Sequence, residues 1–171
     1  MGGDHAPQAP VAGALEALAE LDPAHSIQLV GRRAPIEDQL RAVKGAAADA
    51  RARVEIVDAA DVIEMNEKPT AVRSKPNSSM MLGLKLQAEG KSDAFVSAGN
   101  TGAQMAASML ALRLHAGLKR PAIATIFPTA KRPVVVLDSG ANVDCSADEL
   151  VPFAPLGAVY AEGKMGRANP A

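Results

Sequence analysis

The stretch Val96–Ala103, which reads Val-Ser-Ala-Gly-Asn-Thr-Gly-Ala, has the composition of a tight turn between a strand and a helix. The preceding run Asp93–Ser97 predicts a strand, and the following run Thr101–Leu114 is apolar nearly all round, which predicts a buried helix. The two glycines let a ligand approach the backbone, and Thr101 can cap the helix. Free N–H groups and the positive end of the helix dipole favour an anion at such a start. The stretch therefore predicts an anion site, with a plain strand-to-helix turn as the alternative.

Strands and helices alternate along the chain on both sides of this turn. Apolar periodicity predicts helices that begin near Pro7 and Pro35, a helix over Met80–Glu89 and a last helix within Ala147–Glu162. Further strands are predicted at Ile27–Gly31, Arg53–Val57, Pro121–Phe127 and Pro133–Leu137. The run Val134–Leu137 is continuously apolar, which is typical of a central strand covered on both faces. We expect an α/β fold with a mostly parallel sheet between helices, and ligands at the carboxyl ends of its strands.

The composition narrows the class of protein. The 171 residues suit one domain, and an apolar content of 48% with only 2% aromatics fits helices packed on a sheet. Lys plus Arg is 18 against 19 for Asp plus Glu, which argues against a nucleic-acid partner. The single Cys145 excludes an internal disulfide framework and points to a reducing compartment. No apolar run approaches the roughly 18 residues that span a membrane, so we expect a soluble, cytoplasmic protein.

The two ends of the chain indicate a piece of a longer domain. Met1–His5 opens directly on a loop, and Gly163–Ala171 reads as a linker. We expect residues 1–162 to be the N-terminal part of a single α/β domain and residues 163–171 to be a truncated linker or tail. A proline inside a helix costs about 3 kcal/mol, so the last helix is expected to begin at or after Pro152.

Three further loops carry polar groups that suit chemistry. In Asp138–Cys145 the side chains of Asn142 and Asp144 are candidates for a second wall of the site, and the alternative is a local turn in which Asn and Asp bind their own backbone. In Glu67–Met80 three cations, Lys68, Arg73 and Lys75, suit a phosphate or polyanion, and the alternative is a solvated basic loop. The opening loop Gly2–His5 is glycine-rich, and His5 is a candidate proton carrier.

The sequence carries no signature of a metal or nucleotide cofactor. No His, Cys and Asp cluster has the spacing of a structural zinc site, and the full dinucleotide-binding glycine fingerprint is absent. We therefore expect no metal and no cofactor.

Six short motifs that occur together are specific for one family. In chain order they are Met1–Pro7, Glu67–Arg73, Asn77–Met80, Ser97–Ala103, Arg120–Ala122 and Gly140–Cys145. With these motifs the chain resembles the bacterial phosphate acyltransferases of phospholipid synthesis, the PlsX family, from Met1 to about Pro170.

The resemblance implies that a fatty acyl group passes from acyl-[acyl-carrier-protein] to orthophosphate and gives acyl phosphate. It also implies a homodimer, loose membrane association and a three-layer α/β/α fold like the isocitrate and isopropylmalate dehydrogenases. The family pattern has a strand before the Gly-Gly-Asp loop and continues well past Pro170, so the resemblance implies that this chain is a fragment without the first strand and the C-terminal part.

A division of roles among the candidate residues fits this reaction. Phosphate is assigned to the turn, with residues Ser97, Gly99, Asn100, Thr101 and Gly102, and to Lys68 or Arg73. Asn100 and Asn142 are candidates for orienting phosphate or polarising the thioester carbonyl, and Asp4, His5 and Asp144 for handling protons. Two basic pairs, Lys119–Arg120 and Lys131–Arg132, are candidates for docking the acidic carrier protein, and the alternative is a solvated surface.

Three other functions compete with this one. An acyl-CoA phosphotransferase of the phosphotransacetylase kind needs the same phosphate chemistry. A metal-dependent hydroxyacid dehydrogenase on the same fold needs an acidic metal cluster and a nucleotide site, and the sequence contains neither. The last alternative is a truncated, inactive chain, in which an unfilled sheet position leaves an edge prone to aggregation.

Overall fold

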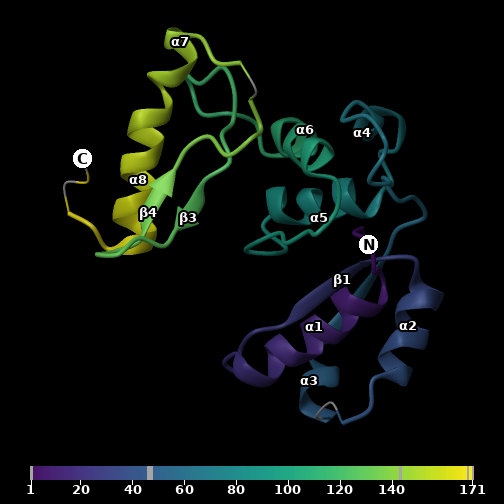
Figure 1. Ribbon diagram of the computed structural model, residues 1–171. Helices are drawn as coiled ribbons and strands as arrows, with labels where there is room; N and C mark the ends of the chain where they lie inside the picture. Colours follow the sequence, from purple (N-terminus) through teal and green to yellow (C-terminus); the bar gives the residue numbers. More distant parts are fainter. Residues whose placement is uncertain (1, 46–47, 143, 169, 171) are drawn as a thin grey trace. The chain divides into compact units, whose positions relative to one another are not determined.

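The computed structural model describes residues 2–45, 48–142, 144–168 and 170, and the chain divides into two compact units, Met1–Arg113 and Leu114–Ala171. Both units combine helices with a small sheet, and Figure 1 labels the elements of each. The α/β class is therefore confirmed. One sheet has two parallel strands and the other has two antiparallel strands within the described ranges. No helix of the described residues is long and apolar enough to cross a membrane.

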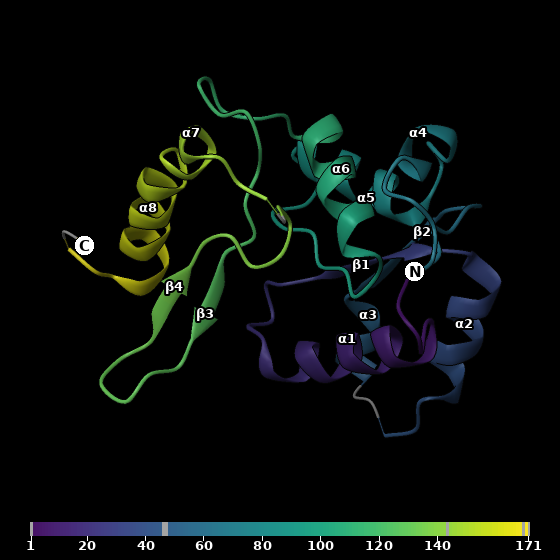
Figure 2. The same ribbon diagram turned by 45° about the horizontal axis from the view of Figure 1, so that its top comes forward.

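The first unit opens with a parallel strand pair and the helices that pack on it. Its elements are α1 (Gln8–Glu20), β1 (Ile27–Gly31), α2 (Arg33–Ala42), α3 (Ala48–Ala52) and β2 (Val54–Asp58). The two strands pair in parallel, with Ile27 opposite Val54 and Gly31 opposite Asp58, which confirms the predicted parallel arrangement. Figure 2 shows α1, α2 and α3 on the same side of these strands.

Alternation along the strands explains this one-sided packing. Ile27 and Leu29 of β1 and Val54 and Ile56 of β2 pack against the buried cluster of the helices. That cluster consists of Val11, Leu15, Leu18, Ile36 and Ala50. Side chains two residues apart in a strand point to the same face of the sheet, so the three helices pack on one apolar face. Val11, Leu15 and Leu18 share one buried face of α1, and α2 ends at Ala42, directly before Val43, which also packs against this cluster.

Three helices build the second half of the first unit. They are α4 (Ala71–Ser74), α5 (Ser79–Ala88) and α6 (Thr101–Ala111). Their buried cluster comprises Ile63, Val72, Met80, Leu84, Ala103 and Ala107. A Cβ added at Gly83 of α5 would lie 2.3 Å from the Phe95 ring, so only glycine allows this approach. The predicted helix at Met80–Glu89 is confirmed, but α6 is shorter than predicted and leaves Met109 and Leu110 exposed.

The run Asp93–Ser97, predicted as a strand, forms no strand in the structure. Its side chains do alternate, because Phe95 packs against the α5–α6 cluster while Val96 is 92% exposed. Alternation describes only the burial of the side chains. A strand also needs a neighbouring backbone that pairs with it through hydrogen bonds. The prediction of a strand here was therefore wrong for the structure as described.

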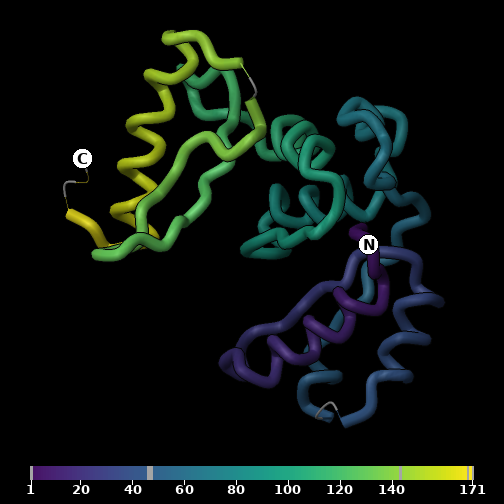
Figure 3. The backbone as a smooth tube through the Cα atoms, viewed as in Figure 1, coloured from purple at the N-terminus to yellow at the C-terminus, as the bar shows by residue number. Residues whose placement is uncertain are grey.

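The second unit consists of a hairpin and a helical segment. Its elements are β3 (Thr125–Phe127), β4 (Val134–Val136), α7 (Ala147–Leu150) and α8 (Phe153–Met165). The strands pair antiparallel, with Thr125 opposite Val136, and Figure 3 shows the chain passing from this hairpin to α8 beside β4. Helix α8 begins directly after Pro152, as predicted, and ends at Met165, beyond the predicted limit of Glu162.

The expectation of a central, doubly covered strand at Val134–Leu137 was wrong. The strand is one half of a two-stranded antiparallel ribbon, and Val134 and Val136 are 37% and 39% exposed. A short apolar run shows that a strand is favourable but does not specify its partner. The turn between β3 and β4 joins neighbouring strands, and such a connection permits only antiparallel pairing.

Candidate functional site

The start of α6 is organised by Asn100, which is 8% exposed. Its Oδ1 accepts the N–H of Ala103 at 3.0 Å, so Asn100 is the N-cap of the helix. The sequence assigned this cap to Thr101, and that assignment was wrong by one position because Thr101 is already the first helical residue. Gly99 is held next to it by its own N–H, which donates to Ser97 Oγ at 3.1 Å.

The amide nitrogen of Asn100 ties the helix start to a distant loop. Nδ2 donates to the carbonyl oxygens of Glu64 at 3.2 Å, Met65 at 3.2 Å and Glu67 at 2.8 Å. One side chain therefore fixes both the first turn of α6 and the segment that follows β2. With its donors and its acceptor engaged by backbone groups, Asn100 is placed to position its neighbours.

Glycines bring the opening loop against this turn. A Cβ on Gly2 would lie 3.3 Å from Gly99 Cα, and a Cβ on Gly3 would lie 2.9 Å from the carbonyl oxygen of Ala98. Gly3 also has a φ of +96°, which L side chains rarely adopt. On the other side, a Cβ on Gly102 would lie 2.9 Å from Pro69 Cγ. Three loops therefore meet at the start of α6 through close contacts at glycines, where a side chain would collide with the neighbouring loop.

An ion pair holds the loop between β2 and α4. Lys75 Nζ lies 2.6 Å from Glu67 Oε2 and donates to the carbonyl oxygen of Val62 at 2.9 Å. Glu67 Oε2 also accepts the N–H of Glu64 at 2.7 Å. The hydrogen bond from Lys75, followed by the one from the Glu64 amide, lowers the pKa of Glu67 below its ordinary value. Of the three cations predicted to face an anion, Lys75 is thus paired, while Lys68 and Arg73 are exposed.

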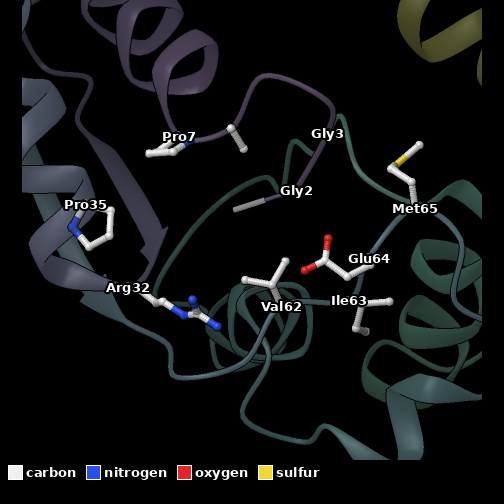
Figure 4. Close-up of a pocket in the computed structure, with 10 residues that line it drawn as sticks. Gly2, Gly3, Pro7, Arg32, Pro35, Val62, Ile63, Glu64 and Met65 are labelled. Carbon is white, nitrogen blue, oxygen red and sulfur yellow. The ribbon is translucent and has the colours of Figure 1, made fainter.

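A pocket of about 260 Å³ lies beside these loops, in the first unit. Arg32 follows β1 directly and Glu64 lies in the segment after β2, so the pocket sits where the carboxyl ends of the parallel strands were expected to place ligands. Figure 4 shows its wall residues, which are Gly2, Gly3, Ala6, Pro7, Arg32, Pro35, Val62, Ile63, Glu64 and Met65. Arg32 and Glu64 were not among the predicted site residues. Arg32 comes directly after β1, and this position is a signal that could have identified it, whereas Glu64 lies six residues after the end of β2 and carries no such signal.

Asp4 and His5 lie in the loop that leads from the two glycines into α1. Both are exposed, and neither lines the pocket. The carbonyl oxygen of His5 accepts the N–H of Ala9 at 2.9 Å, which fixes the backbone but leaves the imidazole accessible. Their proposed part in proton handling stays a prediction.

The candidate loop of the second unit is centred on a carboxylate. Asp138 Oδ1 accepts the Ile123 N–H at 2.7 Å, and Oδ2 accepts the Asn142 N–H at 2.6 Å. Burial alone raises the pKa of Asp138, but the amide donors of Ile123, Asn142 and Ala141 together hold it below its ordinary value. The Asn142 amide donates to the Pro121 carbonyl oxygen at 3.0 Å and to Asp138 at 3.2 Å.

This geometry matches the local Asn and Asp turn that was the alternative for the second loop. Asp144 is exposed, and its neighbour Val143 lies outside the described residues. Of the two basic pairs, Arg120 is bound to Glu149, with Nε 2.9 Å from Oε1, whereas Lys131 and Arg132 are exposed. Among the residues that the structure describes, no three His, Cys, Asp or Glu side chains are grouped to hold a metal ion.

Comparison of the sequence with known proteins identifies the family of this chain. The model of the family described as "Fatty acid synthesis protein" matches residues 1–171. The chain belongs to this family. It is 50% identical to a phosphate acyltransferase of Heliobacterium modesticaldum over 171 residues, covering 99% of this chain and 50% of that protein.

Two further phosphate acyltransferases show a similar identity and a similar coverage. A phosphate acyltransferase of Salinibacter ruber is 50% identical over 163 residues, which cover 94% of this chain and 47% of the relative. One from Koribacter versatilis is 48% identical over 163 residues, covering 94% and 44%. The chain spans about half the length of the curated relatives it matches. The family resemblance inferred from six motifs is thereby confirmed.

Proposed function

We propose that this chain is part of an acyl-[acyl-carrier-protein]:phosphate acyltransferase, which supplies acyl phosphate for phospholipid synthesis. The similarity to phosphate acyltransferases along the chain supports the reaction class. The observation that carries the proposal is the convergence of three loops at the start of α6, where glycines allow the close approach and the N–H groups of Thr101 and Gly102 have no acceptor among the described residues. In this proposal residues 1–162 are the N-terminal part of a single acyltransferase domain, and residues 163–171 a linker or tail.

The proposed reaction requires little covalent chemistry from the protein. A phosphate oxygen attacks the thioester carbonyl carbon, a C–O bond forms, the C–S bond breaks, and the sulfur leaves as the carrier thiol after it takes a proton. Orthophosphate is a competent nucleophile near neutral pH, so the chain needs no covalent intermediate. The site has to hold phosphate, position the thioester and stabilise the oxyanion.

The proposed phosphate site is the first turn of α6. Among the described residues, the N–H groups of Thr101 and Gly102 have no acceptor, and first-turn N–H groups favour anions. Its members are Ser97, Gly99, Asn100, Thr101 and Gly102, with Lys68 or Arg73 as an assisting cation. Because four backbone groups engage the Asn100 side chain, we assign it to positioning of this turn. Asn142 is proposed to orient phosphate or the carbonyl, and Asp4, His5 and Asp144 to handle protons.

The proposal extends to the whole protein that such a chain belongs to. It comprises a three-layer α/β/α fold of the isocitrate and isopropylmalate dehydrogenase kind, a homodimer, and a cytoplasmic enzyme loosely associated with the membrane. Acyl carrier protein and orthophosphate are its proposed partners, with no metal and no cofactor in the reaction.

The experiment measures acyl-phosphate formation from long-chain acyl-ACP and orthophosphate, with Asn100→Ala and Gly102→Val as variants. Valine at position 102 collides with Pro69, so the turn has to shift and the phosphate KM is expected to rise by about tenfold or more. The control is Gly13→Val, because a Cβ at this helical glycine meets no atom within 4 Å. Unchanged rate and phosphate KM in both site variants would reject the assignment of phosphate to this turn.

The same assay distinguishes the competing enzyme. Replacing acyl-ACP by acyl-CoA separates an acyl-ACP enzyme from an acyl-CoA phosphotransferase of the phosphotransacetylase kind. A preference for acyl-ACP supports the proposal, and an equal or better rate with acyl-CoA favours the alternative. Product formation that does not depend on orthophosphate would contradict both.

A further inference from the structure

The pocket at the ends of β1 and β2 has a charge arrangement that the proposed function does not use. Of its ten lining residues only Arg32 and Glu64 carry charged side chains, and the others are apolar or glycine. Figure 4 shows the guanidinium and the carboxylate extending into the pocket from opposite sides, with Gly2 and Val62 between them. A cavity of about 260 Å³ lies below the roughly 300–1,000 Å³ of drug-sized sites, so it fits a small polar ligand.

Both charged side chains have free polar atoms that face this space. Arg32 Nε donates to the carbonyl oxygen of Ala60 at 3.2 Å, which anchors the guanidinium. Within the described ranges, its two terminal nitrogens and the two carboxylate oxygens of Glu64 have no hydrogen-bond or ion-pair partner. The pocket therefore offers donors on one side and acceptors on the other.

The backbone beneath Glu64 is held at both of its polar groups. Its N–H donates to Glu67 Oε2 at 2.7 Å, and its carbonyl oxygen accepts Asn100 Nδ2 at 3.2 Å. Lys75 fixes Glu67 in turn, at 2.6 Å. The fixed backbone keeps Glu64 at the pocket wall, and its exposed side chain reaches the pocket from there.

We propose that this pocket is a binding site for orthophosphate that recognises the proton on the anion. Arg32 donates to the charged phosphate oxygens, and Glu64 accepts the hydrogen bond of a P–OH group. A carboxylate accepts hydrogen bonds but repels a fully ionised oxyanion. Orthophosphate keeps at least one proton near neutral pH and sulfate keeps none, so the pair selects phosphate over sulfate.

This site is separate from the first turn of α6 to which the proposed function assigns the reacting phosphate. The two are neighbours, since Gly2 and Gly3 line the pocket and contact Ala98 and Gly99 of the turn. The inference rests on the proposed function for the identity of the anion only. Binding here would keep the nucleophile close to the turn where it reacts.

The test is calorimetric titration of the whole chain with sodium phosphate and with sodium sulfate at pH 7 and constant ionic strength. Phosphate is expected to bind about tenfold more tightly than sulfate, because only phosphate satisfies Glu64. In Glu64→Gln the phosphate-to-sulfate ratio is expected to fall close to one, with sulfate binding gained. Arg32→Met should weaken both anions about tenfold or more, and Arg32→Lys less, because lysine keeps the charge.

Matched controls are available on α2. Glu37→Gln and Arg41→Met remove surface charges of the same kind, in the exposed pairs with Arg33 and Asp38. Both controls are expected to leave the selectivity unchanged. Equal selectivity loss in Glu37→Gln and Glu64→Gln would overturn the proposal. Circular dichroism of each variant checks folding, and Arg32→Lys and Glu64→Gln both preserve side-chain size.

The two proposals fail in different ways. If phosphate binding is lost in Gly102→Val and unaffected in Arg32→Met and Glu64→Gln, the pocket proposal is rejected and the proposed turn site stands. If Arg32→Met abolishes binding while Gly102→Val keeps it, the turn assignment is rejected. If wild-type chain binds phosphate no better than sulfate, the recognition of the proton is rejected whatever the enzymatic assay shows.

Discussion

The loop at the start of α6 and the loop Asp138–Asn142 of the second unit both place an asparagine and a glycine among small residues. In the first, Asn100 is nearly buried, caps a helix and holds a loop more than thirty residues away in sequence. In the second, Asn142 is half-buried and donates to the neighbouring Asp138 carboxylate and to one carbonyl group.

The difference lies in where the backbone N–H groups are directed. In the second loop the Ile123 and Asn142 amides converge on Asp138, so a carboxylate of the chain already occupies the anion position. At the start of α6 the cap uses the Ala103 amide and leaves the first two helical N–H groups without an acceptor among the described residues. Two loops of similar composition therefore differ in whether they retain donors for an external anion.

The largest loss of stability is expected when either asparagine is replaced by alanine. Asn100→Ala removes a helix cap and the donor of three carbonyl groups, which should lower the free energy of unfolding by about 2–4 kcal/mol. Asn142→Ala, at a half-buried position with two acceptors, should cost about 1–2 kcal/mol. Urea unfolding followed by circular dichroism measures both. Equal losses in the two variants would contradict the different structural roles assigned to Asn100 and Asn142.

A smaller effect is expected when the internal anion of the second loop is removed. Asp138→Ala leaves its amide donors without an acceptor and should cost about 1–3 kcal/mol. Phosphate or sulfate at high concentration should restore part of this loss by occupying the vacated position, and chloride at equal ionic strength is the control. Thermal unfolding in each salt measures the rescue, and the absence of any anion-specific rescue would contradict the assignment.

The Asp138 carboxylate should make the stability of the fold depend on pH. Because the folded-state pKa of Asp138 lies below its ordinary value, ionised Asp138 stabilises the fold above that ordinary value. This stabilisation is lost as the pH falls through the lowered folded-state pKa. In Asp138→Asn the stability should therefore fall less steeply with acidification than in the wild type. Unfolding curves from pH 6 down into the acid range test the slope.

The ion pair between Lys75 and Glu67 should make a smaller contribution to the loss of stability at low pH. The pKa of Glu67 is also lowered, so its stabilisation is present above the ordinary glutamate value and lost as the pH falls through the lowered one. Lys75→Met should flatten this part of the profile and lower Tm by a few degrees at most. Lys91→Met is the matched control, because Lys91 pairs with Glu89 at 2.8 Å on the surface, away from the pocket lining. Hydrogen exchange at residues 62–67 should quicken in Lys75→Met only.

The smallest effect is expected at the two basic pairs of the second unit. Reversing the charges of Lys119, Arg120, Lys131 and Arg132 should weaken binding of acyl carrier protein about two- to fivefold at low salt and less at high salt. Arg120 is already paired with Glu149, so the Lys131–Arg132 reversal alone should give most of the change. Identical binding of wild type and variant at both salt concentrations would remove these pairs from the carrier surface.

Local patterns in the sequence predicted local structure well. The limits of β1 are those expected from Ile27–Gly31, and the proline at position 152 marks the start of α8 as its missing N–H requires. The turn at Ser97–Gly102 was also found from its small residues and the helix that follows. In each case the deciding interaction lies within a few residues of the pattern that predicts it.

Features that depend on a distant partner were not predicted. The antiparallel pairing of Val134–Val136 depends on which strand lies beside it, and the three carbonyl partners of Asn100 come from another loop. Arg32 and Glu64 are far apart in the sequence and line one pocket only because β1 and β2 lie side by side. Sequence periodicity carries no information about such juxtapositions.

The fixed backbone of the 62–67 segment also makes the pocket accessible to protein engineering. Met65 lines the pocket, is 50% exposed, and has its carbonyl oxygen held by Asn100. Its side chain can therefore be exchanged while the loop stays in place. Since Cys145 is the single cysteine of the chain, Cys145→Ser combined with Met65→Cys creates one attachment point for an environment-sensitive fluorophore. A chain labelled in this way becomes an optical sensor whose emission follows the occupancy of the pocket.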